Sequence, residues 1–248
     1  MKAMILAAGL GTRLRPLTND RPKALVEING RTLLEVTLSR LRQFGVSEVI
    51  INVHYFADMI LDYLKANRNF GMRIEVSREE VLLDTGGGLK KAAYFFLKDS
   101  RHPEDPFIVH NVDVLSTIDL GSMLKFHNEN HALATLAVQD RKTSRYLLFD
   151  DQHQLCGRQS SGNPPELVRP CQQALALAFS GIQVLSPRIL KMITEDGAFS
   201  TITSYLRLAA QGEKILAFRA DEYYWRDLGT PANIDQAASD LKQKLITQ

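Results

Sequence analysis

The sequence contains little cysteine and no long hydrophobic segment. Only Cys156 and Cys171 occur among 248 residues, without C-x-x-C spacing, which fits a protein of the reducing cytoplasm. There is no apolar run of about 18 residues and no secretory hydrophobic region, so neither a membrane span nor export is indicated. We therefore expect a cytoplasmic protein without a membrane partner.

The chain also lacks a marked excess of charge of either sign. It has 30 Lys and Arg residues against 28 Asp and Glu residues, and the basic residues are scattered. Neither nucleic acid nor an anionic membrane surface is therefore an expected partner. With 45% hydrophobic residues and no internal repeat, the chain can bury one large core, so we expect a single domain over residues 1–248. The sequence sets no expectation for the oligomeric state.

Strand-like and helix-like patterns alternate along the first half of the chain. Expected strands cover residues 2–7, 48–53, 72–77 and 106–110, and expected helices cover 32–44, 57–67, 86–97 and 120–130. This order predicts an α/β fold with an open, mostly parallel Rossmann-like sheet. Shorter expected strands at 133–138, 146–150 and 154–157 predict a smaller antiparallel part.

The second half is less regular. Serine, glycine and proline between residues 158 and 173 predict a mobile surface loop or hinge. A strand is expected at 174–184, helices at 187–193 and 199–211, and a strand at 214–218. Thr230 is the expected N-cap of a last helix whose first residue is Pro231.

Two familiar glycine motifs are missing after the first expected strand. The dinucleotide-binding fingerprint needs a third glycine where Leu14 stands, and the lysine of a P-loop is absent at its required spacing. Instead, Gly9 and Gly11 flank one residue and are followed by Thr12 and Arg13. Glycines let backbone N–H groups approach a bound oxyanion, and a guanidinium adds positive charge. This turn predicts a phosphate-binding loop, with an ordinary surface turn as the alternative.

The segment from Leu6 to Thr18, with Pro22-Lys23 after it, resembles the signature of the sugar-1-phosphate nucleotidyltransferases. That signature resembles L-A-A-G-x-G-T-R-L-x-P-L-T followed by P-K, and the match is almost letter for letter. Further segments similar to this family lie in order along nearly the whole chain: Asp84-Thr85-Gly86-Gly87-Gly88, Asn111-Val112-Asp113, Phe179-Ser180-Gly181-Ile182 and Trp225-Arg226-Asp227-Leu228-Gly229-Thr230. The resemblance implies a fold of the nucleotide-diphospho-sugar transferase type. Residues 1–115 would then mainly bind the nucleotide, and residues 116–248 mainly the sugar and supply a C-terminal helix.

The resemblance implies that a sugar-1-phosphate oxygen attacks the α-phosphorus of a nucleoside triphosphate and releases pyrophosphate. Because two polyanions must meet, cations have to dominate such a site. Arg13 and Lys23 are the implied catalytic residues, at the leaving group and at the phosphate bridge. The implied nucleotide-binding residues are Leu6, Ala8, Gly9, Gly11, Thr12, Arg13, Lys23, Asp84, Thr85, Gly86, Gly87 and Asn111.

The same resemblance implies Mg²⁺ as cofactor, held by Asp113 and Asp227. A hard cation prefers carboxylate oxygens. Asp113 follows the expected strand 106–110, and open α/β sheets place their ligands at the carboxyl ends of strands. Asp227 alone could equally shape the turn into the last helix. Only the resemblance brings the two acids to one ion.

The implied sugar-binding residues are Gly181, Asn111 and Asp113. Taken by itself, an isolated glycine in a strand more often indicates a bulge. Val112 stands where many relatives have glycine between the asparagine and the aspartate. A β-branched residue would be strained at a positive φ, so we expect an extended backbone at Val112.

Some polar residues are not expected to carry chemistry. His127 and His131 lie four apart on an expected helix but lack the H-E-x-x-H pattern of a zinc site, and both are expected to face solvent. Glu79 and Glu80 are likewise expected to be solvated.

The resemblance implies UTP and N-acetylmuramate-1-phosphate as substrates. GTP with mannose-1-phosphate or a heptose-1-phosphate is the alternative within the family. A catalytically silent, nucleotide-sugar-binding regulatory protein is an alternative of another class, and the joint presence of Arg13, Lys23, Asp113 and Asp227 argues against it. A nicotinamide-dependent dehydrogenase is disfavoured by the missing third glycine.

Overall fold

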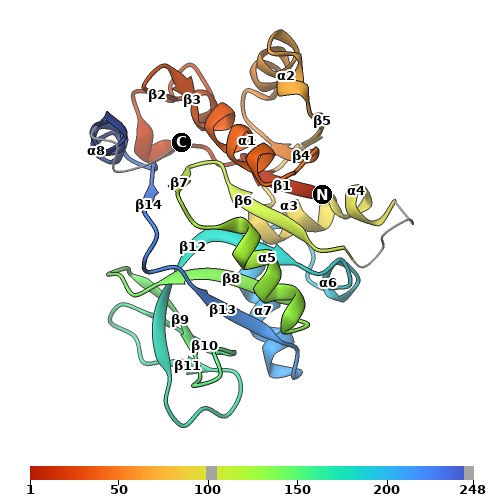
Figure 1. The fold of residues 1–248 in the computed structure, drawn as a ribbon, viewed down its shortest axis with the longest axis vertical. Helices are drawn as coiled ribbons and strands as arrows, with labels where there is room; N and C mark the ends of the chain where they lie inside the picture. The colour runs from red at the N-terminus through yellow and green to blue at the C-terminus, as the bar shows by residue number, and fades with distance from the viewer. Residues whose placement is uncertain (99–104, 243–248) are drawn as a thin grey trace.

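The structure, a computed structural model, describes residues 1–98 and 105–242. It contains a ten-stranded sheet formed by β1 (Lys2–Leu6), β4 (Glu48–Val53), β5 (Arg73–Arg78), β6 (Phe107–Asn111), β8 (Ala134–Gln139), β9 (Arg145–Phe149), β10 (Leu155–Ser160), β11 (Glu166–Leu167), β12 (Leu175–Leu185) and β13 (Ile215–Arg219). The strand order is β11-β10-β9-β12-β6-β1-β4-β5, and β8 and β13 extend from β12 (Figure 1).

The centre of this sheet is parallel. β1 lies between β4 and β6 and pairs with both in parallel, and β5 pairs in parallel with β4. β12 pairs antiparallel with β6, β8 and β9, and β10 pairs antiparallel with both β9 and β11. The predicted α/β fold, with a parallel Rossmann-like centre and a smaller antiparallel part, is confirmed.

Helices cover the sheet and connect its strands. They are α1 (Leu33–Gln43), α2 (Ala57–Ala66), α3 (Asp84–Lys91), α4 (Ala93–Leu97), α5 (Leu120–Glu129), α6 (Ile189–Met192), α7 (Thr201–Ala210) and α8 (Pro231–Lys242), with short 3₁₀ turns η1 (Thr12–Leu14), η2 (Lys23–Leu25) and η3 (Arg68–Gly71). Side chains cap several of them: Thr32 accepts a hydrogen bond from the N–H of Glu35 at the start of α1, and Thr230 accepts one from Asn233 at the start of α8. The predicted cap at Thr230 is therefore confirmed.

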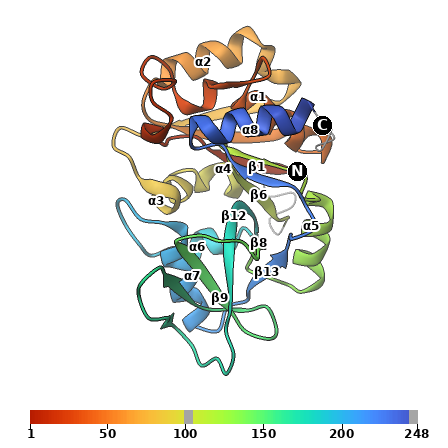
Figure 2. The same ribbon diagram turned by 90° about the vertical axis from the view of Figure 1, so that its left-hand side faces the viewer.

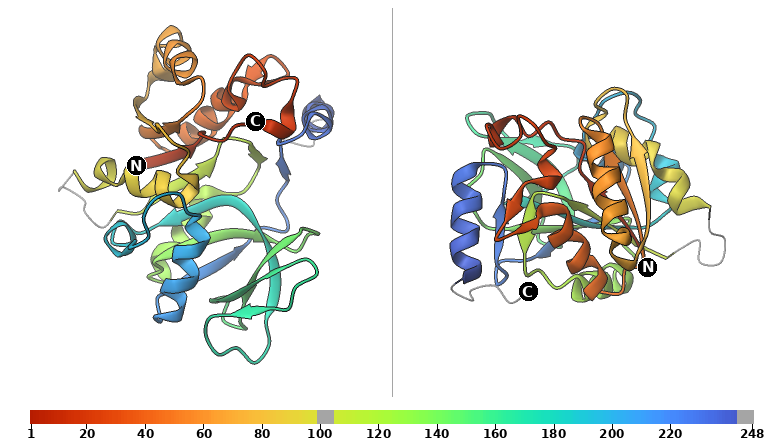
Figure 3. Two further views of the ribbon diagram at one scale, coloured as in Figure 1. Left: turned by 180° about the vertical axis from the view of Figure 1, so that it is seen from behind. Right: turned by 90° about the horizontal axis from the view of Figure 1, so that it is seen from above.

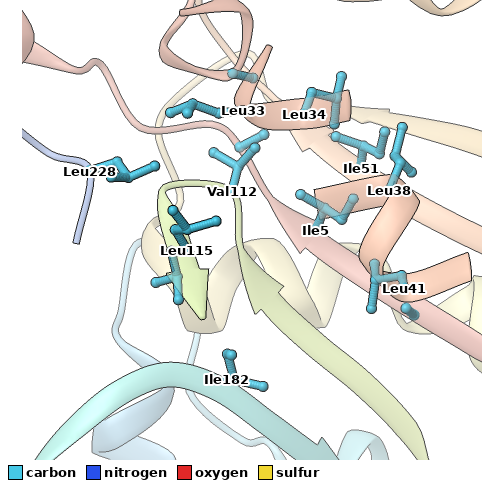
Figure 4. Close-up of a cluster of buried hydrophobic side chains, with 14 of the residues drawn as sticks. Ile5, Leu33, Leu34, Leu38, Leu41, Ile51, Val112, Leu115, Ile182 and Leu228 are labelled. Atoms are coloured by element: carbon cyan, nitrogen blue, oxygen red, sulfur yellow. The ribbon is translucent and has the colours of Figure 1, made fainter. Parts of the chain in front are cut away.

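Successive residues of β1 point to opposite faces of the sheet and supply two hydrophobic cores. Ile5 belongs to a core with leucines of α1 and residues of α2 and α8, whereas Met4 belongs to a core with α3, α4 and α7. Figure 4 shows the first core, where Leu34, Leu38 and Ile51 surround Ile5. Burying each such side chain stabilises the fold by about 1.5–3 kcal/mol.

The last helix returns to the N-terminal half of the molecule. In Figures 2 and 3, α8 lies at the same end of the molecule as β1, α1 and α2, and β9 and α7 lie at the opposite end. The side chain of Asn29 donates a hydrogen bond to the carbonyl of Ala238 in α8. β14 (Trp225–Asp227) leads into α8 and pairs with β7 (Val114–Ser116), and a second two-stranded sheet joins β2 (Glu27–Ile28) to β3 (Arg31–Thr32).

Several expected elements differ from the structure. The single helix expected at 86–97 is two helices, α3 and α4, which are separated at Ala92. The loop expected at 158–173 begins as the end of β10 and contains β11, which pairs with β10.

Two polar side chains expected in solvent are buried. Glu79 is 4% exposed and His127 is 2% exposed. His127 forms hydrogen bonds through Nδ1 with Oγ1 of Thr135 at 2.9 Å and through Nε2 with Oγ of Ser186 at 3.0 Å. Burial lowers the pKa of His127 to about 4, so the ring is neutral at pH 7.

Candidate active site

Several candidate site residues and two further polar residues lie at one edge of the sheet. Leu6 ends β1, Asn52 lies near the end of β4, and Glu79 follows β5. Asn111 ends β6, and Asp113 lies two residues further on. These four strands are parallel, so their carboxyl ends meet at the same edge. Ligands of open α/β sheets bind at this edge.

The two glycines of the loop after β1 differ in their surroundings. Gly11 has φ +64°, and a Cβ there would lie 3.0 Å from Cγ2 of Thr18 and 3.2 Å from Cβ of Lys23. Gly9 has no such contact within 4 Å. In the described chain, the backbone N–H groups of residues 9–11 donate no backbone hydrogen bond. The loop therefore presents free N–H donors, as the phosphate-loop prediction requires.

The Asp113 carboxylate is paired with the Lys23 ammonium. Nζ of Lys23 donates a hydrogen bond to Oδ2 of Asp113, and the two side chains are only 14% and 13% exposed. Lys23 begins η2, which follows the phosphate-binding loop, so the pair joins this loop to the end of β6. Loss of either partner would leave a largely buried charge without compensation.

Asp227 is held beside Asp113 by backbone pairing. Asp227 of β14 lies opposite Val114 of β7, and the N–H of Leu228 donates to the carbonyl of Asp113 at 2.7 Å. The guanidinium of Arg13 lies 3.9 Å from Oδ2 of Asp227. The structure therefore brings together the two acids and the two cations that the sequence analysis assigned to one site.

Gly229 allows the side chains of Arg13 and Asp227 to lie close together. A Cβ at Gly229 would lie 2.5 Å from Oδ1 of Asp227 and 2.6 Å from Nη2 of Arg13. The N–H of Gly229 also donates to Oδ1 of Asp227 at 2.7 Å. In the sequence Gly229 is only one residue of a matching segment, because its contact with Arg13 joins distant parts of the chain.

The two carboxylates fit a magnesium ion better than a metal held entirely by protein. Among residues 1–98 and 105–242, no group of three or more His, Cys, Asp or Glu side chains could hold a metal ion. Mg²⁺ commonly takes one or two carboxylates and completes its coordination with water and phosphate oxygens. Lys23 and Arg13 already place positive charge against Asp113 and Asp227. The donor set thus suits a cation that arrives with a polyphosphate.

Val112 adopts its turn without the strain that a positive φ would impose on a β-branched residue. It lies in the turn between β6 and β7 and is not among the described residues with a positive φ. Its N–H donates to the carbonyl of Leu6 at 3.1 Å, and its side chain is 3% exposed beside Leu115 and Leu228 (Figure 4). The expectation of an extended backbone is met only in the sign of φ, because the residue belongs to a turn.

The three glycines after Thr85 are required for close packing. A Cβ at Gly86 would lie 2.3 Å from the ring of Phe199, and one at Gly87 would lie 2.4 Å from the carbonyl oxygen of Gly197. The N–H groups of Gly86 and Gly87 donate to the carbonyl of Phe199 at 2.8 and 3.3 Å. These two donors are therefore engaged within the chain, whereas Asp84 is exposed and has a left-handed backbone with φ +58°.

Two buried polar side chains connect the phosphate-binding loop to this glycine segment. Oδ1 of Asn52 accepts a hydrogen bond from the N–H of Ala7 at 2.7 Å, and Nδ2 of Asn52 donates to Oε1 of Glu79 at 2.8 Å. The other oxygen of Glu79 accepts a hydrogen bond from the N–H of Leu83 at 3.0 Å. A Cβ at Gly88 would lie within 2.8 Å of both Asn52 and Glu79. Sequence reasoning missed this link, since the only signal was the position of Glu79 just after a strand.

The expected sugar-binding glycine lies against Asn111. Gly181 has φ +73°, and a Cβ there would lie 2.8 Å from Nδ2 of Asn111 and 3.0 Å from Cγ2 of Val114. The pairing of β12 with β8 is irregular between Phe179 and Gln183, so Gly181 lies in a bulge. The predicted site residues gathered at this edge are Leu6, Ala8, Gly9, Gly11, Thr12, Arg13, Lys23, Asn111, Asp113, Gly181 and Asp227.

None of the helices in the described ranges combines the length and the apolar character needed to cross a bilayer.

The chain as a whole is similar to known proteins. The family model described as nucleotidyl transferase matches residues 2–244. The chain is 36% identical over 238 residues to an N-acetylmuramate alpha-1-phosphate uridylyltransferase of Caulobacter vibrioides, covering 92% of each chain. It is 30% identical to a mannose-1-phosphate guanyltransferase of Yarrowia lipolytica, of which it spans 61%, while 93% of this chain is matched.

Solved structures show the same fold. HddC from Yersinia pseudotuberculosis in complex with GMP-PN superposes with a TM-score of 0.74 at 24% identity, covering 97% of this chain and 99% of that one. A UDP-glucose pyrophosphorylase in complex with UDP-glucose gives a TM-score of 0.77 at 19% identity, covering 98% of each chain.

Proposed function

The chain belongs to the nucleotidyl transferase family and is a sugar-1-phosphate nucleotidyltransferase, and from this premise we propose that it uses UTP and N-acetylmuramate-1-phosphate. The products would be the corresponding UDP-sugar and pyrophosphate. The choice of substrates is supported by the uridylyltransferase of Caulobacter vibrioides, because the match extends over most of both chains. The observation that carries the reaction type is the meeting of Arg13, Lys23, Asp113 and Asp227 at one edge of the sheet.

In this proposal the N–H donors of residues 9–11 bind the β- and γ-phosphates of the triphosphate. Arg13 is 67% exposed and can follow the leaving pyrophosphate, offsetting the charge that gathers there. Lys23 exchanges Asp113 for the phosphate bridge when the substrates enter. No protein nucleophile is needed, since the attacking oxygen is already an anion.

Asp113 and Asp227 would hold Mg²⁺, which supplies charge neutralisation at the phosphate oxygens when bound. Asn111, next to Gly181, would bind the sugar together with Asp113. Asp84, which is exposed, and the partly buried Thr85 would contact the base, and Gly86 and Gly87 would bring the backbone near it.

We also propose which part of the chain binds each substrate, and that the protein is cytoplasmic. Residues 1–115 mainly bind the nucleotide, and residues 116–248 mainly bind the sugar, although α8 packs with the first half. A cytoplasmic protein would meet both proposed substrates, UTP and the sugar phosphate.

A guanylyltransferase acting on mannose-1-phosphate or a heptose-1-phosphate is the second candidate, favoured by the similarity to the Yarrowia lipolytica enzyme. The two candidates are separated by incubating the protein with Mg²⁺, each of the four nucleoside triphosphates and a panel of sugar-1-phosphates. Pyrophosphate release is the readout. Preferential turnover of UTP with N-acetylmuramate-1-phosphate supports the proposal, and preferential turnover of GTP with a neutral sugar phosphate contradicts it.

A further inference from the structure

An arginine outside the predicted site lies over the ring of the tryptophan of β14. Arg141 follows β8, and its Cζ lies 3.7 Å from the centroid of the Trp225 ring. Its Nη2 donates a hydrogen bond to the carbonyl of Phe179 at 2.8 Å. Cation–π stacking of this kind fixes the plane of a guanidinium and leaves its edge for hydrogen bonding.

Both partners in this stack are held by the surrounding backbone. Nε1 of Trp225 donates to the carbonyl of Ser180 at 2.7 Å. The residues before Arg141 are anchored as well: Nε2 of Gln139 donates to the carbonyl of Ala220 at 2.7 Å, and the N–H of Asp140 donates to Oδ1 of Asp221 at 2.6 Å. The guanidinium is therefore positioned before any ligand arrives, which lowers the entropy lost on binding.

The stack faces the sugar side of the proposed active site. Trp225 and Asp227 are two residues apart on β14, so their side chains share one face of the strand. Phe179, which accepts the hydrogen bond from Arg141, is two residues before Gly181. Arg141 thus lies next to the strand that approaches Asn111 and on the side of the Asp227 carboxylate.

Arg141 is a half-buried cation whose hydrogen-bonding capacity is not fully used within the described chain. It forms no ion pair within 4.0 Å in residues 1–98 and 105–242, and its buried Nε has no hydrogen-bond partner there. Burial lowers the pKa of Arg141, and the nearby charge of Asp227 opposes this shift. A half-buried cation without an ion-pair partner is costly in the free protein, and an arriving anion would offset its charge.

We propose that Arg141, stacked on Trp225, is a specificity-determining residue that binds the carboxylate of an acidic sugar-1-phosphate. The planar guanidinium suits the two oxygens of a carboxylate. The inference rests on the proposed function and names the part of the sugar that is recognised: the lactyl carboxylate, which distinguishes N-acetylmuramate from neutral hexoses. The phosphate groups have other cations available, namely Arg13 and Lys23.

The test combines a change in the enzyme with a change in the substrate. Kinetics at saturating UTP compare the wild type and Arg141→Gln on N-acetylmuramate-1-phosphate, on its lactyl methyl ester and on N-acetylglucosamine-1-phosphate. Arg141→Gln should raise KM for the acid by roughly 10- to 100-fold, and esterification should impair the wild type by a similar factor. The variant should be indifferent to esterification, because a double-mutant cycle isolates the interaction of the two groups.

Matched variants separate recognition from folding. Lys142→Gln removes an adjacent exposed cation and should leave all three substrates unaffected. Arg141→Lys retains the charge without the planar fork and should restore part of the preference for the acid. If Arg141→Gln does not fold, the response of the wild type to esterification and that of Arg141→Lys still decide the matter.

Two outcomes overturn the inference alone: wild-type enzyme that accepts acid and ester equally, or an Arg141→Gln variant that loses the same factor on the acid and on N-acetylglucosamine-1-phosphate. The second result would mean that Arg141 binds the shared phosphate or only supports the fold. Wild-type enzyme that turns over neutral sugar phosphates but not N-acetylmuramate-1-phosphate overturns the proposed function, and this inference with it.

Discussion

Lys23 and Asp113 form an ion pair across the carboxyl edge of the sheet, although ninety residues separate them in the chain. Each belongs to a different loop, one after β1 and one after β6, and both side chains are largely buried. The pair holds the Asp113 carboxylate in position where a polyphosphate and its cation would arrive. It also means that the lysine competes with any cation that binds Asp113.

This competition predicts tighter magnesium binding when Lys23 loses its charge. In Lys23→Gln, Asp113 has no ammonium partner, so Mg²⁺ alone should raise the melting temperature more than it does in the wild type. Transfer activity should fall by at least about 100-fold, because a cation at the phosphates is lost. Thermal unfolding over a range of Mg²⁺ concentrations measures the effect. A smaller magnesium response in Lys23→Gln than in the wild type would refute this competition.

The two glycines of the phosphate-binding loop should respond differently to alanine. Gly11→Ala places a Cβ 3.0 Å from Thr18 in a left-handed backbone and should destabilise the protein by about 1–3 kcal/mol. Gly9→Ala meets no atom within 4 Å, so it should leave stability nearly unchanged. If its N–H approaches an oxyanion closely, KM for UTP should still rise. Urea denaturation and kinetics of both variants check this, and equal losses of stability would contradict it.

Glu79 should control the affinity for the nucleotide without contacting it. Glu79→Gln leaves one acceptor oxygen, so only one of the two hydrogen bonds from Asn52 and Leu83 can persist, and the connection from Asn52 to the segment leading to Asp84 is broken. KM for UTP should rise by about 5- to 30-fold, with a smaller change in kcat, since one buried hydrogen bond contributes about 1–2 kcal/mol. The exposed neighbour provides the control, and Glu80→Gln with an equal effect would show that only net charge matters.

Burial of His127 predicts loss of stability in mild acid. Its pKa is lowered from 6.5 to about 4 in the folded protein, so the unfolded chain takes up a proton at higher pH than the folded one. The stability from the neutral ring is complete above pH 6.5 and is lost as the pH falls to about 4, by on the order of 3 kcal/mol.

His127→Gln should therefore show a shallower fall in the free energy of unfolding between pH 6.5 and 4. Part of the fall should persist, because burial also lowers the pKa of His110 to about 4. His131→Asn, at an exposed position, is the control. Parallel slopes for His127→Gln and the wild type would show that this ring does not titrate as expected.

Local patterns were sufficient for much of the fold. The β-branched run at 48–53 coincides with β4, since a central parallel strand is apolar on both faces. The loop after β1 was also predicted, because glycine spacing and basic residues are local signals. The direct resemblance of the segments around Asp113 and Asp227 placed these acids in one site, and backbone pairing between β7 and β14 shows how they meet.

The remaining features depend on distant contacts. β7 and β14 are three-residue strands that exist only because they pair with each other. Glu79 is buried because Asn52, on the neighbouring strand, supplies a donor, and a run of acidic residues alone reads as solvated surface. The family resemblance implies that Gly86 binds the nucleotide, whereas its surroundings show that the Phe199 ring excludes a larger residue at this position.

We propose that Asp113 and Asp227 hold the magnesium ion for nucleotidyl transfer. Pyrophosphate release by the variant Asp113→Asn tests this role most directly. With UTP, N-acetylmuramate-1-phosphate and Mg²⁺, the variant should lose at least about 1,000-fold in kcat/KM while remaining folded, because an amide is a poor ligand for a hard cation. Asp58→Asn, which changes an exposed acid paired with Arg78, should retain wild-type activity. An Asp113→Asn variant with turnover close to that of the wild type would contradict the account.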